Sequence, residues 1–266
     1  MFARIRYYLD RRIIKASKIT PLEWQSAFDS LPLLDRLSAN EKTFLRELAI
    51  LFIHRKTFEG AKGFVVTLPM ALIISLQACL PVLKLGLDCY AGWSVVIVYA
   101  SAFMPTRSMI DEFGVEHTMR SNLAGESWQQ GPVILAWDEA EVAGIIDGHN
   151  LIVHEFAHKL DMQNGVANGF PPLHVDMHVD DWVEAFTAGF KDLQHRCRSG
   201  KFNDVDCYAA TSPAEFFAVL SEIFFERPSV LKHYYKEIYA QLRAYYRQDP
   251  LRRMSCRNKT ATIIEA

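Results

Sequence analysis

An apolar stretch of this 266-residue chain contains two histidines and a glutamate within a span of five residues. His154, Glu155 and His158 form the pattern HExxH in LIVHEFAHKL, residues 151–160. On a helix, residues four apart share one face, so both imidazoles can bind one ion, and zinc accepts imidazole nitrogen. Glu155 lies about 100° further round, where it can act as general base on a metal-activated water. The pattern predicts a zinc hydrolase; the alternative is two neutral buried histidines with hydrogen-bond partners.

A third ligand must come from elsewhere in the chain. The metzincin continuation requires glycine and histidine where this chain has Asp161 and Asn164, so that class is excluded. A glutamate from a later helix is the other common solution. Glu215 and Glu222 are seven residues apart in the apolar segment 212–228, and therefore share a helix face. The carboxylates that could supply the ligand are Glu184, Glu215, Glu222 and Glu226.

Some of the carboxylates near the predicted site have more than one interpretation. Ser212 and Glu215 also fit a capping box, in which Glu215 only closes the start of a helix. Glu222 is either a ligand or a group that orients an imidazole. Asp161, one turn after His158, is either another orienting group or an exposed helix residue. Spacing alone does not decide among these roles.

The elements that must position these residues are mostly helical. Thr20 begins one helix, Ser38 or Asn40 begins the next, and Pro250 ends the last. The β-branched runs predict strands, and the long irregular segment after the HExxH helix is typical of a functional loop. We predict an α+β, mainly helical fold with a small sheet beside the HExxH helix. The expected elements are helices within 20–60 and at 70–87, 151–160, 181–197, 212–228 and 230–250, strands at 92–100 and 132–137, and loops at 161–180 and 199–211.

Composition excludes several classes of protein. Half of the residues are hydrophobic and the formal net charge is −2, which argues against a direct nucleic-acid binder. The apolar stretch 68–87 is interrupted by Pro69, Gln77, Pro81 and Lys84, so no transmembrane segment is predicted. The five cysteines form no CxxC pair and are odd in number. We therefore expect reduced thiols in a cytoplasmic protein.

No linker or internal repeat divides the chain, so we expect a single domain over residues 1–266. Residues 1–19 carry six basic residues and one acid, which predicts a basic N-terminal arm. This arm is either solvated or weakly attached to an anionic membrane or partner. Residues 251–266 are expected to form a loose C-terminal tail. The strand PVILAW (132–137) either pairs with an extended peptide or lies inside the sheet.

Several longer motifs resemble those of a known family. HEFAHKLDMQNG, YAATSPAEFFAVLSEIFFE, YYRQDPL and GESWQQGPVILAW are similar to motifs of the Mlc titration factor A family of bacterial zinc metallopeptidases, over residues 20 to 251. That family is gluzincin-like and is related in site architecture to the anthrax lethal factor catalytic domain. The resemblance implies a zincin-like metallopeptidase domain that binds one Zn²⁺ per chain. The basic residues of the N-terminal arm match no motif of the family.

The resemblance also implies roles for individual residues. His154, His158 and Glu215 match zinc-ligand positions, and Glu155 matches the catalytic base. Tyr208 matches a tyrosine that stabilises the transition state; the alternative is a core tyrosine. The composition around His117 predicts a loop. By the resemblance, His117 matches a histidine that can act as a fourth zinc ligand and close the resting site.

The implied activity is aminopeptidase-like hydrolysis of peptide bonds. The implied partner is Mlc, a DNA-binding repressor of sugar-uptake genes that the family protein sequesters. We therefore expect a cytoplasmic zinc peptidase that also regulates transcription by binding an Mlc-like repressor. The alternative is a non-catalytic protein-binding regulator whose zinc site is closed and structural.

Overall fold

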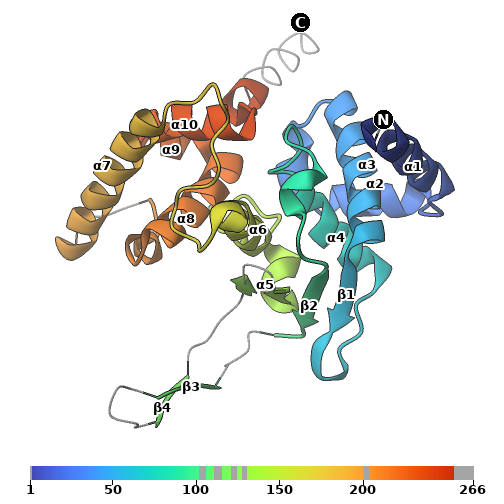
Figure 1. Ribbon diagram of the computed structural model, residues 1–266, viewed down its shortest axis with the longest axis horizontal. Coiled ribbons are helices and arrows are strands. Elements are labelled where there is room, and N and C mark those ends of the chain that lie inside the picture. Colours follow the sequence, from blue (N-terminus) through green and yellow to red (C-terminus); the bar gives the residue numbers. More distant parts are fainter. Residues whose placement is uncertain are drawn as a thin grey trace, which may run out of the picture.

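A computed structural model of the chain describes residues 2–101, 131–200 and 204–254, together with the backbone of three short strands between residues 106 and 127. Figure 1 shows α1 to α4 on the right in blue, α7 to α10 on the left from gold to red, and α6 between the two groups. The predicted α+β, mainly helical class is confirmed.

The N-terminal group is made of four helices. Thr20 and Ser38 each close a capping box at the start of a helix, as their sequence signatures predict. The third and fourth helices pack against each other, and the fourth against the HExxH helix. The helices are α1 (Phe2–Ala16), α2 (Pro21–Asp29), α3 (Ala39–Arg55) and α4 (Leu68–Cys79), with 3₁₀ turns η1 (Pro32–Arg36), η2 (Ala61–Gly63) and η3 (Leu87–Tyr90).

The C-terminal group holds the remaining helices. The single amphipathic helix predicted over residues 230–250 is wrong. Tyr235 leaves helical geometry at φ −136°, ψ 68°, and divides the segment into two helices. The elements are α5 (Trp137–Val142), α6 (Leu151–Asp161), α7 (Val179–Arg198), α8 (Pro213–Glu226), α9 (Pro228–Tyr234) and α10 (Lys236–Tyr246), with 3₁₀ turns η4 (Met162–Asn164) and η5 (Cys207–Ala210).

A four-stranded sheet lies beside α6 in the order β1-β2-β6-β5. The first three strands are parallel and β5 runs antiparallel to β6, with Ile97 opposite Ile134 in the central pair. Because β6 has a partner on each side, the structure favours the interior strand over the alternative that β6 pairs with an extended peptide. The strands are β1 (Thr57–Gly60), β2 (Val95–Tyr99), β5 (Gly125–Ser127) and β6 (Val133–Ala136); β3 (Thr106–Ile110) and β4 (Glu116–Arg120) form a separate antiparallel pair.

The buried face of α6 fixes it in the core. Phe156 is fully buried, and its ring contacts Phe52, Tyr90 and Trp93 at centroid distances of 5.6, 5.1 and 5.8 Å. Large aromatic groups in such edge-to-face contact contribute strongly to packing. Within the described ranges, no helix is long and apolar enough to cross a bilayer, and α4 is a helix of the core.

The two ends of the described chain are more ordered than expected. The basic N-terminal segment is a helix: α1 packs along α3, held by ion pairs from Arg11 to Glu47 and from Arg55 to Asp10. The arm is therefore a helix that packs on α3, with most of its basic residues exposed to solvent. Near the other end, Arg253 pairs with Glu41 at 2.6 Å, so residues 251–254 are not a loose tail, while the rest of the predicted tail lies outside the described residues.

The cysteines also differ from expectation. A disulfide joins Cys197, at the end of α7, to Cys207, at the start of η5, so the prediction of five reduced thiols is wrong. The fold brings the two Cα atoms within 5.8 Å although ten residues separate them. Cys79 and Cys89 are free, and Cys256 lies outside the described residues. Since disulfides are rare in the cytosol, the cysteines do not support the predicted cytoplasmic location.

Gly169 should tolerate a side chain poorly. Its φ is +77°, and a Cβ there would lie 2.4 Å from the carbonyl oxygen of Pro213, at the start of α8. Gly63 has a similar φ of +81° but open space around it. Gly63→Ala should therefore cost only the left-handed penalty, about 1 kcal/mol, and Gly169→Ala about 2 kcal/mol more. Thermal unfolding measures both; equal losses of stability would show that the contact with Pro213 relaxes freely.

Candidate metal centre

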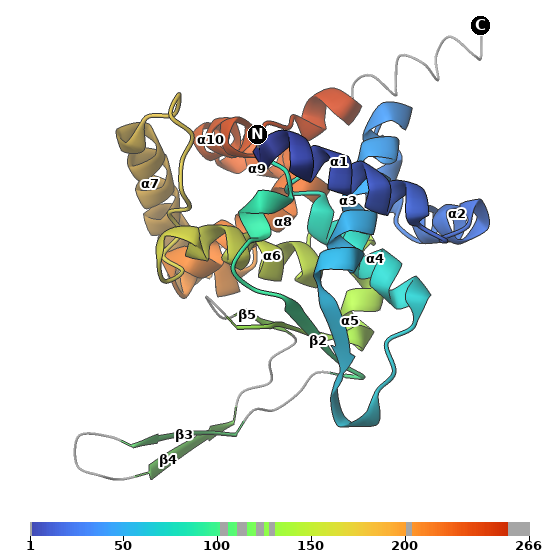
Figure 2. The same ribbon diagram turned by 45° about the vertical axis from the view of Figure 1, so that its right-hand side comes forward.

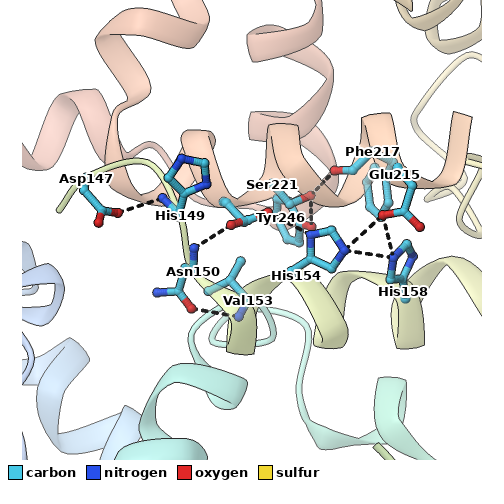
Figure 3. Close-up of polar contacts among 11 residues, drawn as sticks. Asp147, His149, Asn150, Val153, His154, His158, Glu215, Phe217, Ser221 and Tyr246 are labelled. Carbon is cyan, nitrogen blue, oxygen red and sulfur yellow. Dashed lines mark hydrogen bonds and ion pairs between the residues drawn. The ribbon is translucent and has the colours of Figure 1, made fainter. Parts of the chain in front are cut away.

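The centre begins at the N-terminus of α6. Asn150 caps this helix with its side-chain oxygen, which accepts from Val153 N at 2.9 Å. From that fixed start, His154 and His158 fall on one face, one turn apart, and their Nε2 atoms lie 3.1 Å from each other (Figure 3). The spacing in the sequence therefore produces the predicted pair of convergent imidazoles.

Glu215 completes the cluster from α8. Its Oε2 lies 3.0 Å from His154 Nε2 and 3.4 Å from His158 Nε2, on the side of α8 that faces α6 (Figure 3). Ligand atoms at about 2.0–2.1 Å from a tetrahedral zinc lie about 3.3 Å apart, so the triangle has the right size for an ion. These three residues are the group that could hold a metal ion within the described part of the chain.

The capping alternative for Glu215 is half right. Ser212 does cap α8, because its side chain accepts from Glu215 N at 3.2 Å. The Glu215 carboxylate, however, is turned to the histidines, so the reciprocal half of a capping box is not made. One residue thus serves two purposes: its backbone starts the helix and its side chain faces the centre.

The position of the proton on His154 determines which of its ring nitrogens can bind a cation. His154 Nδ1 lies 2.8 Å from Glu222 Oε1, and a carboxylate can only accept, so Nδ1 carries the proton. In the neutral ring, Nε2 then presents a lone pair toward Glu215. Burial opposes charge on His154, but its hydrogen bonds to Glu215 and Glu222 prevail and raise its pKa well above the usual value. The site therefore favours a positive charge, which a proton or a metal ion can supply.

Glu222 lies outside the cluster of three candidate ligands and contacts the Nδ1 side of the His154 ring. Glu222 also accepts a hydrogen bond from the backbone N–H of Asn150. Both hydrogen bonds of this carboxylate therefore join α8 to the first turns of α6. Asn150 also donates from its side-chain nitrogen to Glu226 Oε1 at 3.0 Å and to Gln77 Oε1 at 2.8 Å. Sequence reasoning missed Asn150, although an asparagine immediately before an apolar helical run is a capping signal that could have revealed it.

Glu226 stands further along α8, away from the cluster of ligand atoms. It accepts from Gly148 N at 2.8 Å and is fully buried. Burial is the main cause that raises its pKa to about 8, with the charges of Asp147 and Glu222 adding to it. Glu226 is therefore a structural acid in the same network, and not the third ligand.

Glu155 is buried beside the cluster. It is 3 % exposed, and one of its carboxylate oxygens has no hydrogen-bond partner in the described structure. Burial raises its pKa, and the opposing charges of His154 and His158 do not cancel this effect. A carboxylate with an unoccupied acceptor and a raised pKa suits a general base.

Tyr208 lies at the open side of the cluster, on η5. Its ring centroid is 6.2 Å from that of His154, and the side chain is 49 % exposed, so the alternative of a core tyrosine is wrong. Burial of part of the side chain, with the charges of Glu215 and Glu155, raises its pKa to about 12. The hydroxyl therefore keeps its proton at neutral pH and can donate it in a hydrogen bond.

The other predicted site residues lie apart from the cluster or outside the described side chains. Glu184 is exposed on α7. Asp161 is fully buried, not exposed, and holds the loop after α6 by accepting from Asn168 N and Gly169 N. His117 is in β4 rather than in a loop, opposite Met109; its side chain lies outside the described residues, so its role as a fourth ligand stays a prediction.

Comparison with known proteins agrees with this geometry. The family model described as glucose-regulated metallo-peptidase M90 matches residues 5–247. A protein named Mlc titration factor A from Serratia proteamaculans is 36% identical over 238 residues, covering 88% of this chain and 90% of that protein. Proteins of the same name from Escherichia coli O127:H6 and Shigella flexneri serotype 5b are each 36% identical over 252 residues, covering 94% of both chains.

Three substitutions should separate ligand, orienting group and cap. Glu215→Ala should lose most of the bound metal, because it removes a ligand. Glu222→Gln should weaken metal affinity by about 10- to 100-fold, as expected when an imidazole loses its partner. Ser212→Ala should keep full metal and lose about 1 kcal/mol of stability, since it removes only the cap. Elemental analysis and metal titration measure these effects; full metal in Glu215→Ala would reject Glu215 as ligand.

Proposed function

The chain belongs to the M90 family of glucose-regulated metallopeptidases, and we propose on this premise that it is a zinc-dependent peptidase that is aminopeptidase-like in its action. We take residues 1–266 as one metallopeptidase domain. One observation carries the proposal: with His154 Nδ1 committed to Glu222, two imidazole nitrogens and a carboxylate oxygen converge within 3.4 Å of one another. Three such atoms form an open set of catalytic type, with three protein ligands.

His154, His158 and Glu215 would hold the ion, with His117 as the proposed fourth ligand of a closed resting state. Bound there, zinc would supply Lewis acidity to the scissile carbonyl and to a water. Two imidazoles and one carboxylate are a donor set that suits this metal.

The chain's own residues would move the proton and stabilise the developing charge. Glu155 would take a proton from the attacking water on its unoccupied oxygen and pass it to the leaving amine. Tyr208 would donate its hydroxyl to the oxyanion, because its raised pKa keeps the proton in place. Its exposure leaves the substrate free access to that side of the cluster.

The regulatory part of the proposal comes from the relatives. The name of these relatives, Mlc titration factor A, supports a role in binding an Mlc-like transcriptional repressor. Because a DNA-binding repressor acts in the cytoplasm, we place this protein there too. The alternative function is a non-catalytic regulator that binds its partner through its surface, with His117 completing a closed structural site.

Glu155→Gln should decide between these functions. The amide cannot accept the water's proton, so hydrolysis should fall by at least about 100-fold while the metal is retained. Glu184→Gln, an equal change at an exposed site on α7, should leave both unchanged. Peptide hydrolysis assays, read beside elemental analysis, test this. Wild-type rates in Glu155→Gln, or no hydrolysis by metal-loaded wild-type protein, would favour the non-catalytic regulator.

Tyr208→Phe should lower kcat by about 100-fold and change KM little, because an oxyanion donor acts mainly in the transition state. Tyr7→Phe, which removes a hydroxyl from an exposed tyrosine on α1, serves as the matched control. Steady-state kinetics on a short peptide measure the two constants. A rise in KM with unchanged kcat would show instead that Tyr208 only binds substrate.

A further inference from the structure

We propose that the outer face of α1, together with the groove between α1 and α3, binds the surface of an anionic lipid bilayer. This inference goes beyond the proposed peptidase function and does not depend on it. The binding region is far from the metal centre: in both views α1, in dark blue, lies on the outside of the molecule across α3, while α6 and α8 carry the ligands (Figures 1 and 2).

The first observation is apolar surface left in solvent. On α1, Ile5 and Leu9 are about half exposed, and Tyr7 and Tyr8 are each 69 % exposed. Ile5, Tyr8 and Leu9 stand at positions i, i+3 and i+4, so they form one stripe. Ile14, which packs against the core, lies on the opposite side of the helix from Ile5. The helix thus has an apolar face that the rest of the fold does not use.

This stripe runs into an apolar groove. Ile5, Leu9 and Ile13 follow one another at intervals of four, and Leu9 and Ile13 line a hollow of about 780 Å³ between α1 and α3. Arg12 and His54 stand among the aliphatic side chains that line it. The other lining residues are Ala16, Ser17, Ile19, Ile50 and Ile53. A groove of aliphatic side chains with the cation of Arg12 among them suits acyl chains beneath anionic headgroups.

The second observation is charge. The first eighteen residues hold six basic residues and one acid, a net +5, so the rest of the chain carries −7 of the total of −2. Four of the basic residues are exposed and make no ion pair within the described part of the chain. These residues are Arg4, Arg12, Lys15 and Lys18. Arg4, Tyr8 and Arg12 lie on one face at intervals of four, so cations flank the apolar stripe.

These features together identify the occupant. A second copy of the chain would bring +5 against +5 at the same face, which like-charge repulsion opposes. A bilayer with anionic headgroups offers negative charge at its surface and hydrocarbon beneath it. The exposed cations of α1 match the headgroups and its apolar stripe matches the hydrocarbon. Tyrosine is among the residues enriched at the membrane–water interface, and Tyr8 projects from the stripe. Ion pairs of α1 with α3 preform the helix, so binding needs no folding step.

Vesicle co-sedimentation of the full chain tests the proposal. The protein should bind vesicles of phosphatidylcholine containing about one third phosphatidylglycerol, and bind pure phosphatidylcholine at least tenfold more weakly. Each exposed cation contributes about fivefold to partitioning onto an anionic surface, so Arg4→Glu/Arg12→Glu should reduce binding by at least about 25-fold. The matched control is Lys191→Glu/Lys236→Glu, the same change in charge at exposed sites on α7 and α10.

A second variant separates membrane binding from simple charge attraction. Tyr8→Ser/Leu9→Ser keeps every charge and should still reduce vesicle binding several-fold, since it removes the apolar stripe. Circular dichroism and metal content of each variant confirm folding. Equal binding to both kinds of vesicle, equal losses in the control variant, or binding to a polyglutamate peptide without binding to anionic vesicles would overturn the proposal.

Discussion

The contact between α6 and α8 is the constraint on which the centre depends. Two residues of α6's first turns, Asn150 and His154, are held by the same carboxylate, Glu222 of α8, through a backbone N–H and a ring N–H. A shift of either helix by one residue would rotate its side chains by about 100° and break both bonds. The hydrogen bonds therefore fix the register of the two helices, and with it the positions of the three candidate ligands.

This contact also concentrates negative charge. Glu155, Glu222 and Glu226 are all buried, and burial together with the charge of Glu222 raises the pKa values of Glu155 and Glu226. Burying several carboxylates is costly unless positive charge or donors compensate. Glu226 is relieved by Gly148 and Asn150, and Glu222 by His154, whereas Glu155 keeps one oxygen without a partner. The network thus provides hydrogen-bond donors for Glu222 and Glu226, and it leaves one oxygen of the candidate base Glu155 without a donor.

The sequence predicted the parts of this arrangement that depend on local spacing. HExxH, the caps at Thr20 and Ser38, and the strand with Ile97 follow from periodicity and capping rules. Spacing could not decide whether Glu215 is a candidate ligand or part of a capping box, because both roles use the same position. Only the packing of α8 on α6 turns its carboxylate toward the histidines. The break at Tyr235 and the bond between Cys197 and Cys207 also depend on tertiary contacts. Local rules do not contain that information.

The order of the ligands along the chain has a consequence for biosynthesis. His154 and His158 leave the ribosome more than fifty residues before Glu215, and α8 must then pack onto α6 before the three side chains meet. N-terminal segments emerge first, and a complete metal site rarely exists in an unfolded chain. A nascent chain that still lacks α8 therefore has two histidines but no centre. The candidate metal centre can therefore form only after α8 has been synthesised and has packed onto α6.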